Sequence, residues 1–275
     1  MKTLIPKLVG ALINCIGFFN ASYASKLALK LFSKPRSGQL TSSANLFLET
    51  ANKKTLFYND TPIQTYHWKG DKETLLLAHG WESNTSRWRH KIETLHKEGY
   101  SIYALDGPAH GASGSDTFNA ILYSEFINVV SQEFKPTVFI GHSVGGMALV
   151  IFLEKQIYKN AQKMVLLGAP SGFKGIMQRY KNMMGYSPTI CEGIDAEIEL
   201  KFGHHPNYFS TADFAKKIET EGLLFHDKND AIIPYSDALE IDAEYKNATL
   251  ITTEGLGHSL KGDFVSGEII KFLSH

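Results

Sequence analysis

Cysteine is nearly absent from this chain of 275 residues, which contains only Cys15 and Cys191. Two cysteines so far apart in sequence cannot build a disulfide framework, and they lack the spacing of a structural zinc site. We therefore expect two free thiols in a reducing compartment.

The sequence also has no excess of charge of either sign, because Lys+Arg and Asp+Glu both number 28. No overall field attracts the chain to nucleic acid, and no low-complexity tract interrupts it. The composition predicts a globular protein, long enough for one large domain with a substantial core, without a nucleic-acid partner.

A hydrophobic run long enough to span a membrane comfortably is also missing, although residues 1–32 are apolar with scattered lysines. A secretory signal would require cleavage near Ala24, but Pro6, Lys7 and Asn14 interrupt its apolar stretch. A transmembrane helix would need a longer stretch. The third interpretation is one or two amphipathic helices.

The amphipathic interpretation depends on apolar residues that recur at helical spacing and share one face: Ile5, Leu8, Leu12, Cys15, Ile16 and Phe19. A second piece over residues 26–32 places two leucines together and two lysines together. We favour helices that dock on the domain or lie at a membrane surface. We therefore expect a cytoplasmic protein, with peripheral membrane contact in the second of these two cases, and an exported one only if residues 1–24 are a signal peptide. The oligomeric state is left open.

After a polar linker over residues 35–41, strands and helices alternate along the chain. A hairpin is expected over residues 55–58 and 63–68. Further strands are expected over residues 74–78, 101–105, 137–140, 163–167, 223–226 and 248–252. Helices are expected to begin near Ser86, Asp116, Val144 and Tyr235, with a last one over residues 260–273. The alternation predicts an α/β fold with a mainly parallel sheet and helices on both faces. We assign residues 1–54 to N-terminal helices and linker, and residues 55–275 to the main domain.

The longest gap between strands, residues 171–221, is rich in methionine and aromatic residues. It predicts an insertion of short helices, which is either an ordinary helical layer or a lid whose flexible methionines accommodate apolar ligands. Both can hold together. Met177, Met183 and Met184, together with His142 from outside the insertion, are the candidates for a substrate pocket.

The sequence Gly141-His142-Ser143-Val144-Gly145 lies between an apolar run typical of a buried strand and one typical of a buried helix. Gly-x-Ser-x-Gly in this context predicts a nucleophile elbow, a sharp turn that presents the serine hydroxyl at the end of the sheet. The motif alone is weak, because small residues in turns produce it by chance. Ser143 needs a base, an acid and an oxyanion hole from other strand ends.

Two later loops supply the acid and the base. Asp230 follows the strand expected over residues 223–226 and precedes an apolar run, so we expect it to be buried, whereas Asp227 nearer the turn is expected to be exposed. His258 lies in a glycine-rich loop before the last helix, where an imidazole can reach Ser143. Ser143, Asp230 and His258 are then nucleophile, acid and base of a catalytic triad.

The oxyanion hole is expected from backbone rather than side chains. A tight turn at His79-Gly80-Trp81 can aim the N–H of Trp81 at the site, and the N–H of Val144 would be its partner. His79, like Asp106 and His110 in the next loop, could take a catalytic role. We assign all three to hydrogen bonds that hold turns.

These motifs together resemble the α/β-hydrolase superfamily over about residues 55–275. The matching stretches are His79-Gly80-Trp81, residues 106–114, residues 141–146, residues 230–234 and Gly257-His258. The sequences of these motifs are most similar to those of the esterase, lipase and serine-aminopeptidase-like branch with a short cap. The resemblance implies an eight-stranded sheet, the triad and oxyanion hole named above, and no cofactor. Ala109 and Asp227 stand where that family usually has glycine, which puts the subfamily rather than the activity in doubt.

We expect a serine hydrolase that cleaves small uncharged carboxylic esters through an acyl-enzyme. Acyl transfer or amide hydrolysis on the same triad is the alternative, because fold alone does not settle the reaction. A haloperoxidase label would describe a side activity of such a site. A non-catalytic binding protein on this scaffold is less favoured, because a binding module has no need of all three triad groups in register.

Overall fold

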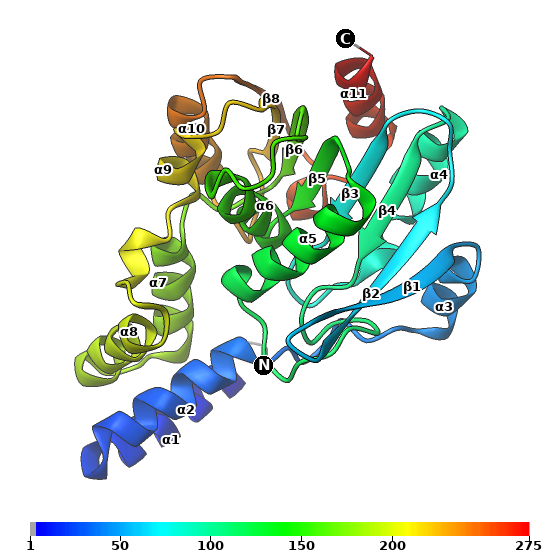
Figure 1. Cartoon of the computed structure of the whole chain (residues 1–275). Coiled ribbons are helices and arrows are strands. Elements are labelled where there is room, and N and C mark those ends of the chain that lie inside the picture. The colour runs from blue at the N-terminus through cyan, green and yellow to red at the C-terminus, as the bar shows by residue number, and fades with distance from the viewer. Residues whose placement is uncertain (1–3, 275) are drawn as a thin grey trace. The chain divides into compact units, whose positions relative to one another are not determined.

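Short apolar runs bounded by turn residues form the eight strands of one sheet in the computed structural model, which describes residues 4–274. The strands are β1 (Asn52–Tyr58), β2 (Thr61–Trp68), β3 (Thr74–Ala78), β4 (Ser101–Leu105), β5 (Val138–His142), β6 (Lys163–Leu167), β7 (Glu221–Asp227) and β8 (Ala248–Thr253). Their order across the sheet is β1-β2-β4-β3-β5-β6-β7-β8 (Figure 1). The expected eight-stranded sheet is confirmed.

The sheet is antiparallel only at one edge, where β1 pairs with β2 and β2 pairs with β4. All other neighbours run parallel, and the register aligns Ala78 of β3 with Gly141 of β5, and His142 with Leu167 of β6. Parallel strands end at a common edge, so the loops after β3, β5, β7 and β8 emerge there together. The expected functional residues each follow one of these strands, in the order Trp81, Ser143, Asp230 and His258.

Helices cover both faces of the sheet (Figure 1). One face packs against α3 (Ser42–Leu48), α4 (Arg89–Lys97) and α11 (Asp263–Leu273), whose apolar side chains share a core with alternate residues of the central strands. The other face carries α5 (Ala120–Phe134) and α6 (Val144–Glu154). All five residues of β5 are buried, as expected for a strand covered on both sides. The remaining elements here are η1 (Thr85–Trp88), α9 (Thr211–Ala215), α10 (Tyr235–Glu244) and η3 (Gly257–Ser259).

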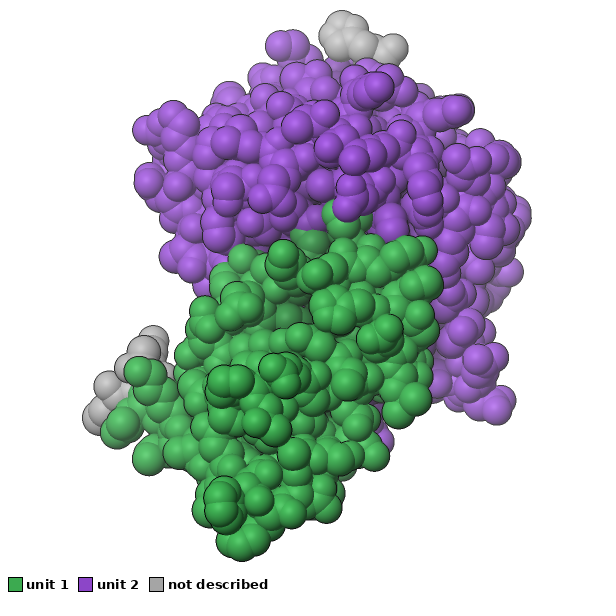
Figure 2. Space-filling model, turned by 90° about the vertical axis from the view of Figure 1, so that its left-hand side faces the viewer, with its two compact units in different colours: residues 1–34, 172–210 green, residues 35–171, 211–275 purple. Residues whose placement is uncertain are grey.

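The chain divides into two compact units, which Figure 2 colours separately. Unit 2 (residues 35–171 and 211–275) contains the sheet and the helices described above. Unit 1 (residues 1–34 and 172–210) is helical, with α1 (Leu4–Phe19), α2 (Ala21–Ser33), α7 (Phe173–Met184), α8 (Pro188–Phe202) and η2 (Pro206–Tyr208). The N-terminal helices therefore pack with the inserted helices. The expected boundary between the N-terminal segment (residues 1–54) and the main domain (residues 55–275) stays a prediction.

Helix α1 approaches the end of α7 closely in unit 1. A Cβ at Gly10 would lie 1.8 Å from the carbonyl oxygen of Met184, so only glycine permits this contact. The side chain of Asn14 donates to the carbonyl of Gly185 and accepts from the N–H of Ser187, both at 2.9 Å. Asn14, which interrupts the apolar run of residues 8–19, thus bonds the backbone of the α7–α8 turn.

Most expected elements are confirmed, although several strand bounds shift by one to three residues and three helices differ from expectation. The helix expected near Asp116 begins at Ala120, because the side chain of Asn119 accepts from the N–H of Leu122 and caps it there. The last helix begins at Asp263 rather than residue 260, where Leu260 is left-handed with φ 46°. Helix α3 was not expected, since its seven residues are too few for a periodic pattern. Among residues 4–274, no helix is both long and apolar enough to cross a membrane.

Candidate active site

The turn between β5 and α6 has the backbone of a nucleophile elbow. Ser143 has φ 54° and ψ −126°, a conformation that costs a non-glycine residue of order 1–3 kcal/mol. Its N–H donates to the carbonyl of Leu167 at 2.8 Å. A Cβ at Gly145 would lie 2.3 Å from the carbonyl oxygen of Ala78, so the second glycine of the motif permits α6 to start against the end of β3. The expected sharp turn at Ser143 is confirmed.

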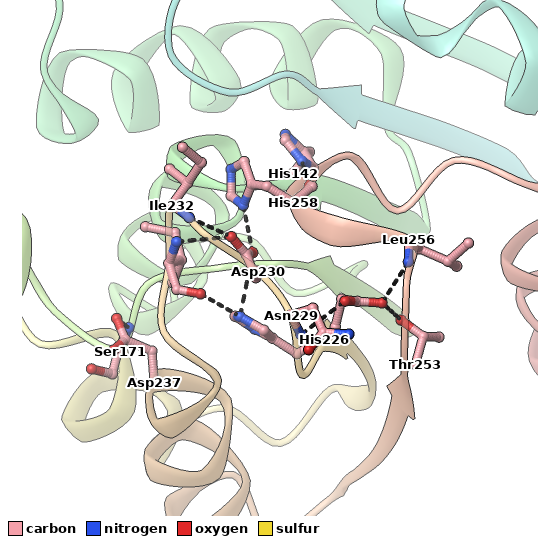
Figure 3. Close-up of polar contacts among 12 residues, drawn as sticks. His142, Ser171, His226, Asn229, Asp230, Ile232, Asp237, Thr253, Leu256 and His258 are labelled. Carbon is pink, nitrogen blue, oxygen red and sulfur yellow. Dashed lines mark hydrogen bonds and ion pairs between the residues drawn. The ribbon is translucent and has the colours of Figure 1, made fainter. Parts of the chain in front are cut away.

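The loops after β7 and β8 bring Asp230 and His258 together (Figure 3). His258 Nδ1 lies 2.6 Å from Asp230 Oδ2. The other carboxylate oxygen accepts from the N–H of Ile232 at 2.8 Å and of Ile233 at 3.0 Å. Burial by itself raises the pKa of Asp230, but the hydrogen bonds from His258 and the two N–H groups outweigh it and leave the pKa below its ordinary value. Asp230 is therefore ionised and fixes the proton of His258 on Nδ1.

His226, the second-to-last residue of β7, hydrogen-bonds the turn that carries Asp230. His226 Nε2 donates to the carbonyl of Ile233 at 2.9 Å and lies 3.5 Å from Asp230 Oδ2 (Figure 3). The imidazole is buried. His226 therefore orients Asp230, a contact that the sequence pattern did not indicate because His226 has only the features of a strand residue.

The expectation that Asp227 is exposed was wrong. Its side chain is fully buried and accepts from the Oγ1 of Thr253 and the N–H of Leu256, both at 2.8 Å. The N–H groups of Asn229 and Gly255 add two further bonds. Burial works to raise the pKa of Asp227, but these four donors leave it lowered. A carboxylate at a strand end can be buried when the next loop directs its N–H groups at it, and here it ties the loop that leads to His258.

His142 reaches the backbone of His258 rather than its imidazole. Its Nε2 donates to the carbonyl oxygen of His258 at 2.7 Å, while its Nδ1 is buried and has no partner among the described residues. Burial first, and then the charge of Arg87, hold the pKa of His142 well below its ordinary value. The ring is therefore neutral with its proton on Nε2. Its assignment to the substrate pocket stays a prediction.

Two cations hold the next two carbonyls of the same loop. Arg87 Nη2 donates to the carbonyl of Ser259 at 3.3 Å, and Lys91 Nζ donates to that of Leu260 at 2.9 Å. Burial lowers the pKa of Lys91 to about 8, with Arg87 and Lys261 contributing through their charges. Three consecutive carbonyls, at residues 258 to 260, are thus each fixed by a side chain; we call this set the base-loop clamp. No local sequence signal marks Arg87 or Lys91, because their partners lie 172 and 169 residues away.

The turn after β3 packs directly on the elbow, where the oxyanion hole was expected. A Cβ at Gly80 would lie 2.9 Å from Ser143 Cβ and 3.0 Å from His142 Nδ1. Trp81 follows Gly80, and its ring contacts Phe118 with centroids 5.3 Å apart. Val144 is the first residue of α6, so its N–H has no acceptor within the helix. The roles of Trp81 and Val144 as oxyanion donors stay predictions.

The structural role expected for His79 is confirmed. Its Nδ1 donates to the carbonyl of Gly80 at 2.7 Å, and its Nε2 accepts from the N–H of Gly107 at 2.8 Å. Complete burial, reinforced by the neighbouring His110, lowers the pKa of His79 to about 3, so the ring stays neutral. It joins the turns after β3 and β4.

Asp106 and His110 also hold turns, as expected. Asp106 accepts from the N–H groups of Thr85 and Ala112, both at 2.9 Å, and from the hydroxyl of Tyr66 at 3.0 Å. His110 Nε2 accepts from the N–H of Glu82 at 2.9 Å. Both side chains are fully buried.

The three methionines expected in a pocket all lie on α7 of unit 1. Met177 and Met184 are buried in that unit, while Met183 is 49% exposed. Their role as pocket residues stays a prediction. Over residues 4–274, no group of three or more His, Cys, Asp or Glu side chains is placed to hold a metal ion.

Known proteins resemble this chain in sequence and in fold. The model of a family described as "Alpha/beta hydrolase family" matches residues 75–260. A non-heme haloperoxidase of Rhodococcus erythropolis is 22% identical, with 82% of this chain and 98% of the relative covered. A bifunctional esterase/perhydrolase of Acinetobacter calcoaceticus is also 22% identical, with 82% and 99% covered. The solved structure of an esterase from Exiguobacterium antarcticum superposes with a TM-score of 0.65 at 19% identity, covering 82% of this chain and all of that one.

Proposed function

Because the chain belongs to the alpha/beta hydrolase family, we propose that it is a serine hydrolase acting on carboxylic esters. The observation that carries the proposal is the 2.6 Å contact between His258 Nδ1 and Asp230 Oδ2, on loops that emerge at the same sheet edge as Ser143. Because the ionised carboxylate of Asp230 accepts a hydrogen bond from Nδ1–H of His258, the unprotonated Nε2 can accept a proton. A neutral imidazole oriented in this way is a general base.

In the proposed reaction, His258 removes the hydroxyl proton of Ser143 as Oγ attacks the ester carbonyl carbon. Asp230 stabilises the imidazolium that forms. The backbone N–H groups of Trp81 and Val144 donate to the developing oxyanion, and the latter N–H also lies at the positive end of α6. The imidazolium returns its proton to the departing alcohol, which leaves an ester between Ser143 and the acyl group. Water, deprotonated by the same imidazole, then attacks the acyl carbon and breaks its bond to Ser143 Oγ. The imidazolium returns the proton to Oγ as the acid leaves.

For the substrate we propose uncharged esters with short to medium acyl chains. Support comes from residues 171–221, whose sequence is rich in methionine and aromatic side chains. Methionine adapts to apolar ligands of varied shape. A series of nitrophenyl esters of increasing acyl length measures this preference, and faster cleavage of amides or of charged acyl groups would overturn it.

A fluorophosphonate probe tests the nucleophile. The wild type should be labelled, Ser143→Ala should lose labelling, and His258→Ala should lose it while keeping the wild-type circular dichroism spectrum. Ser43→Ala is the matched control, because Ser43 is an exposed serine on α3. Absence of labelling in the folded wild type would overturn the proposal in favour of a binding protein.

A second activity is favoured by the names of the two relatives, a haloperoxidase and an esterase/perhydrolase. Hydrogen peroxide in place of water would attack the acyl-enzyme, breaking the ester to Ser143 and releasing a peroxyacid. The test adds peroxide to an ester assay and measures peroxyacid. Formation that depends on Ser143 supports the activity, and release of carboxylic acid alone overturns it.

A further inference from the structure

The N-terminal helix of unit 1 turns its large apolar side chains outward. Leu8, Leu12 and Phe19 are 61, 62 and 83% exposed. Each is one or two turns of α1 from the next, so they form one stripe along the helix. The same side of α1 also carries exposed Leu4, Ile5, Cys15 and Phe18. We call this surface the α1 outer face. It holds most of the apolar residues whose helical spacing predicted docking on the domain or contact with a membrane.

Packing on the opposite side of α1 fixes this orientation. Gly10 and Ile13 are the buried residues of the helix, and Gly10 meets the backbone of Met184 with no room for a side chain. Asn14 bonds two backbone groups of the α7–α8 turn. Rotating α1 to bury its leucines would break these bonds and force larger side chains against Met184. The α1 outer face is therefore directed outward by the fold of unit 1 itself.

Positive charge accompanies the apolar stripe. Residues 1–34 contain five lysines and no acidic residue, although the whole chain is neutral. Lys7 on α1 and Lys26 and Lys30 on α2 are exposed, and the last two lie one turn apart beside exposed Tyr23. Every acidic residue of unit 1 lies on α8. Among these, Glu197 reaches Lys26 at 3.8 Å, a long ion pair whose lysine side chain is 59% exposed and whose glutamate side chain is 20% exposed. Such a long, partly exposed pair contributes little.

We propose that the α1 outer face and the lysines of α2 dock the protein on the surface of an anionic lipid bilayer. A helix of 16 residues with leucine and phenylalanine on one face is too short to span and suited to lie in the interface plane. Lysines near such a helix bind anionic headgroups, each strengthening binding about fivefold at low salt. A water-soluble protein partner could use the leucines, but five lysines with no acidic residue within residues 1–34 favour a uniformly negative surface.

Sedimentation with vesicles tests the proposal on the full-length protein. Vesicles of phosphatidylcholine alone are compared with an equimolar mixture of phosphatidylcholine and phosphatidylglycerol. The wild type should bind the mixture and be released by raised salt. The triple variant Leu8→Ser, Leu12→Ser, Phe19→Ser should bind about a hundredfold more weakly, since three partly inserted apolar side chains are lost. The pair Lys26→Gln, Lys30→Gln should bind about twentyfold more weakly.

Leu200→Ser is the matched control, because Leu200 is 79% exposed on α8 of the same unit. It should bind like the wild type, and all variants should keep the wild-type melting temperature and fluorophosphonate labelling. Equal binding to both vesicle types, or equal binding by the triple variant and the control, overturns the proposal. A dimer by light scattering that the triple variant abolishes, without vesicle binding, assigns the face to a second copy instead. Mature protein that begins after Ala24 overturns it in favour of an export signal.

Discussion

The imidazole of His142 donates a hydrogen bond from Nε2 to the backbone carbonyl of His258, at 2.7 Å. His142 directly precedes Ser143, so this bond connects the strand that ends in the proposed nucleophile with the loop that carries the proposed base. The proton must lie on Nε2, because a carbonyl oxygen only accepts. His142 thus fixes the loop of the proposed base through a ring that is neutral at neutral pH.

Replacing His142 should reduce turnover more than binding. His142→Ala removes one hydrogen bond to the loop, and such bonds contribute about 0.5–1.5 kcal/mol, so we expect kcat to fall up to about tenfold with KM nearly unchanged. His142→Gln, whose amide N–H can reach the same carbonyl, should recover much of the rate. Steady-state kinetics on a nitrophenyl ester measure both parameters. A lowered melting temperature with unchanged kcat would show that His142 serves packing alone.

The two carboxylates after β7 should separate into a catalytic and a structural residue. Asp230→Asn keeps an acceptor for the N–H groups of Ile232 and Ile233 but removes the charge beside His258, so kcat should fall by about 10³–10⁴ with little change in stability.

Asp227→Asn serves as its counterpart. It weakens four hydrogen bonds to a buried carboxylate, and charged bonds of this kind contribute about 1.5–3 kcal/mol. We expect a loss of that order in the free energy of unfolding, measured in urea, and far less loss of kcat than in Asp230→Asn. The reverse pattern would exchange the roles of the two residues.

Replacing Ala109 by glycine should stabilise the folded protein. Its φ is 60°, in the left-handed region where a Cβ costs about 1–2 kcal/mol. Glycine removes this strain but adds entropy to the unfolded chain, so Ala109→Gly should raise the free energy of unfolding by about 0.5–1 kcal/mol. Ala112→Gly in the same loop, where φ is not positive, should lower it. A loss of stability in Ala109→Gly would mean that its methyl group packs more strongly than its backbone is strained.

Lys91 should make stability depend on alkaline pH. Burial lowers its pKa to about 8 in the folded protein, against 10.5 when unfolded. Between these values the unfolded state binds the proton and the folded state does not, so stability rises with pH across that window. The cost of burying the charged amine is complete below about pH 8 and vanishes above the unfolded pKa.

The variant Lys91→Met isolates this contribution from the other lysines. The difference in unfolding free energy, wild type minus variant, should increase from pH 8 to pH 10.5 by an amount of the order of 3 kcal/mol. Urea denaturation at a series of pH values measures it. A constant difference over this range would show that Lys91 keeps an ordinary pKa.

The sheet could be predicted from sequence because its strands are short apolar runs between turn residues, and β3, β4 and β6 have the predicted bounds. The elbow could be predicted because Gly-x-Ser-x-Gly is local. The pairing of Asp230 with His258 could be predicted because each follows a strand, and parallel strands end at the same edge of the sheet.

Long-range polar contacts could not be predicted. Arg87 and Lys91 look like surface charges of an amphipathic helix, and nothing local indicates that they reach the carbonyls of Ser259 and Leu260. Asp227 was misjudged for the same reason, since its burial depends on N–H groups from the next loop. The spacing of the α1 leucines predicted a face but not its direction, because Gly10 and Asn14 decide which side meets α7.

The base-loop clamp has a consequence for how the protein folds. Its three contacts join residues 116, 172 and 169 positions apart in the chain, and closing such long loops is slow compared with forming local structure. Helix α6, which follows Ser143, can form from neighbouring sequence, whereas β5 needs β3 and β6 as partners. His258, the proposed base, acquires its position only when the last fifth of the chain has joined the sheet. During refolding, recovery of the proposed esterase activity is therefore expected to lag behind the recovery of secondary structure.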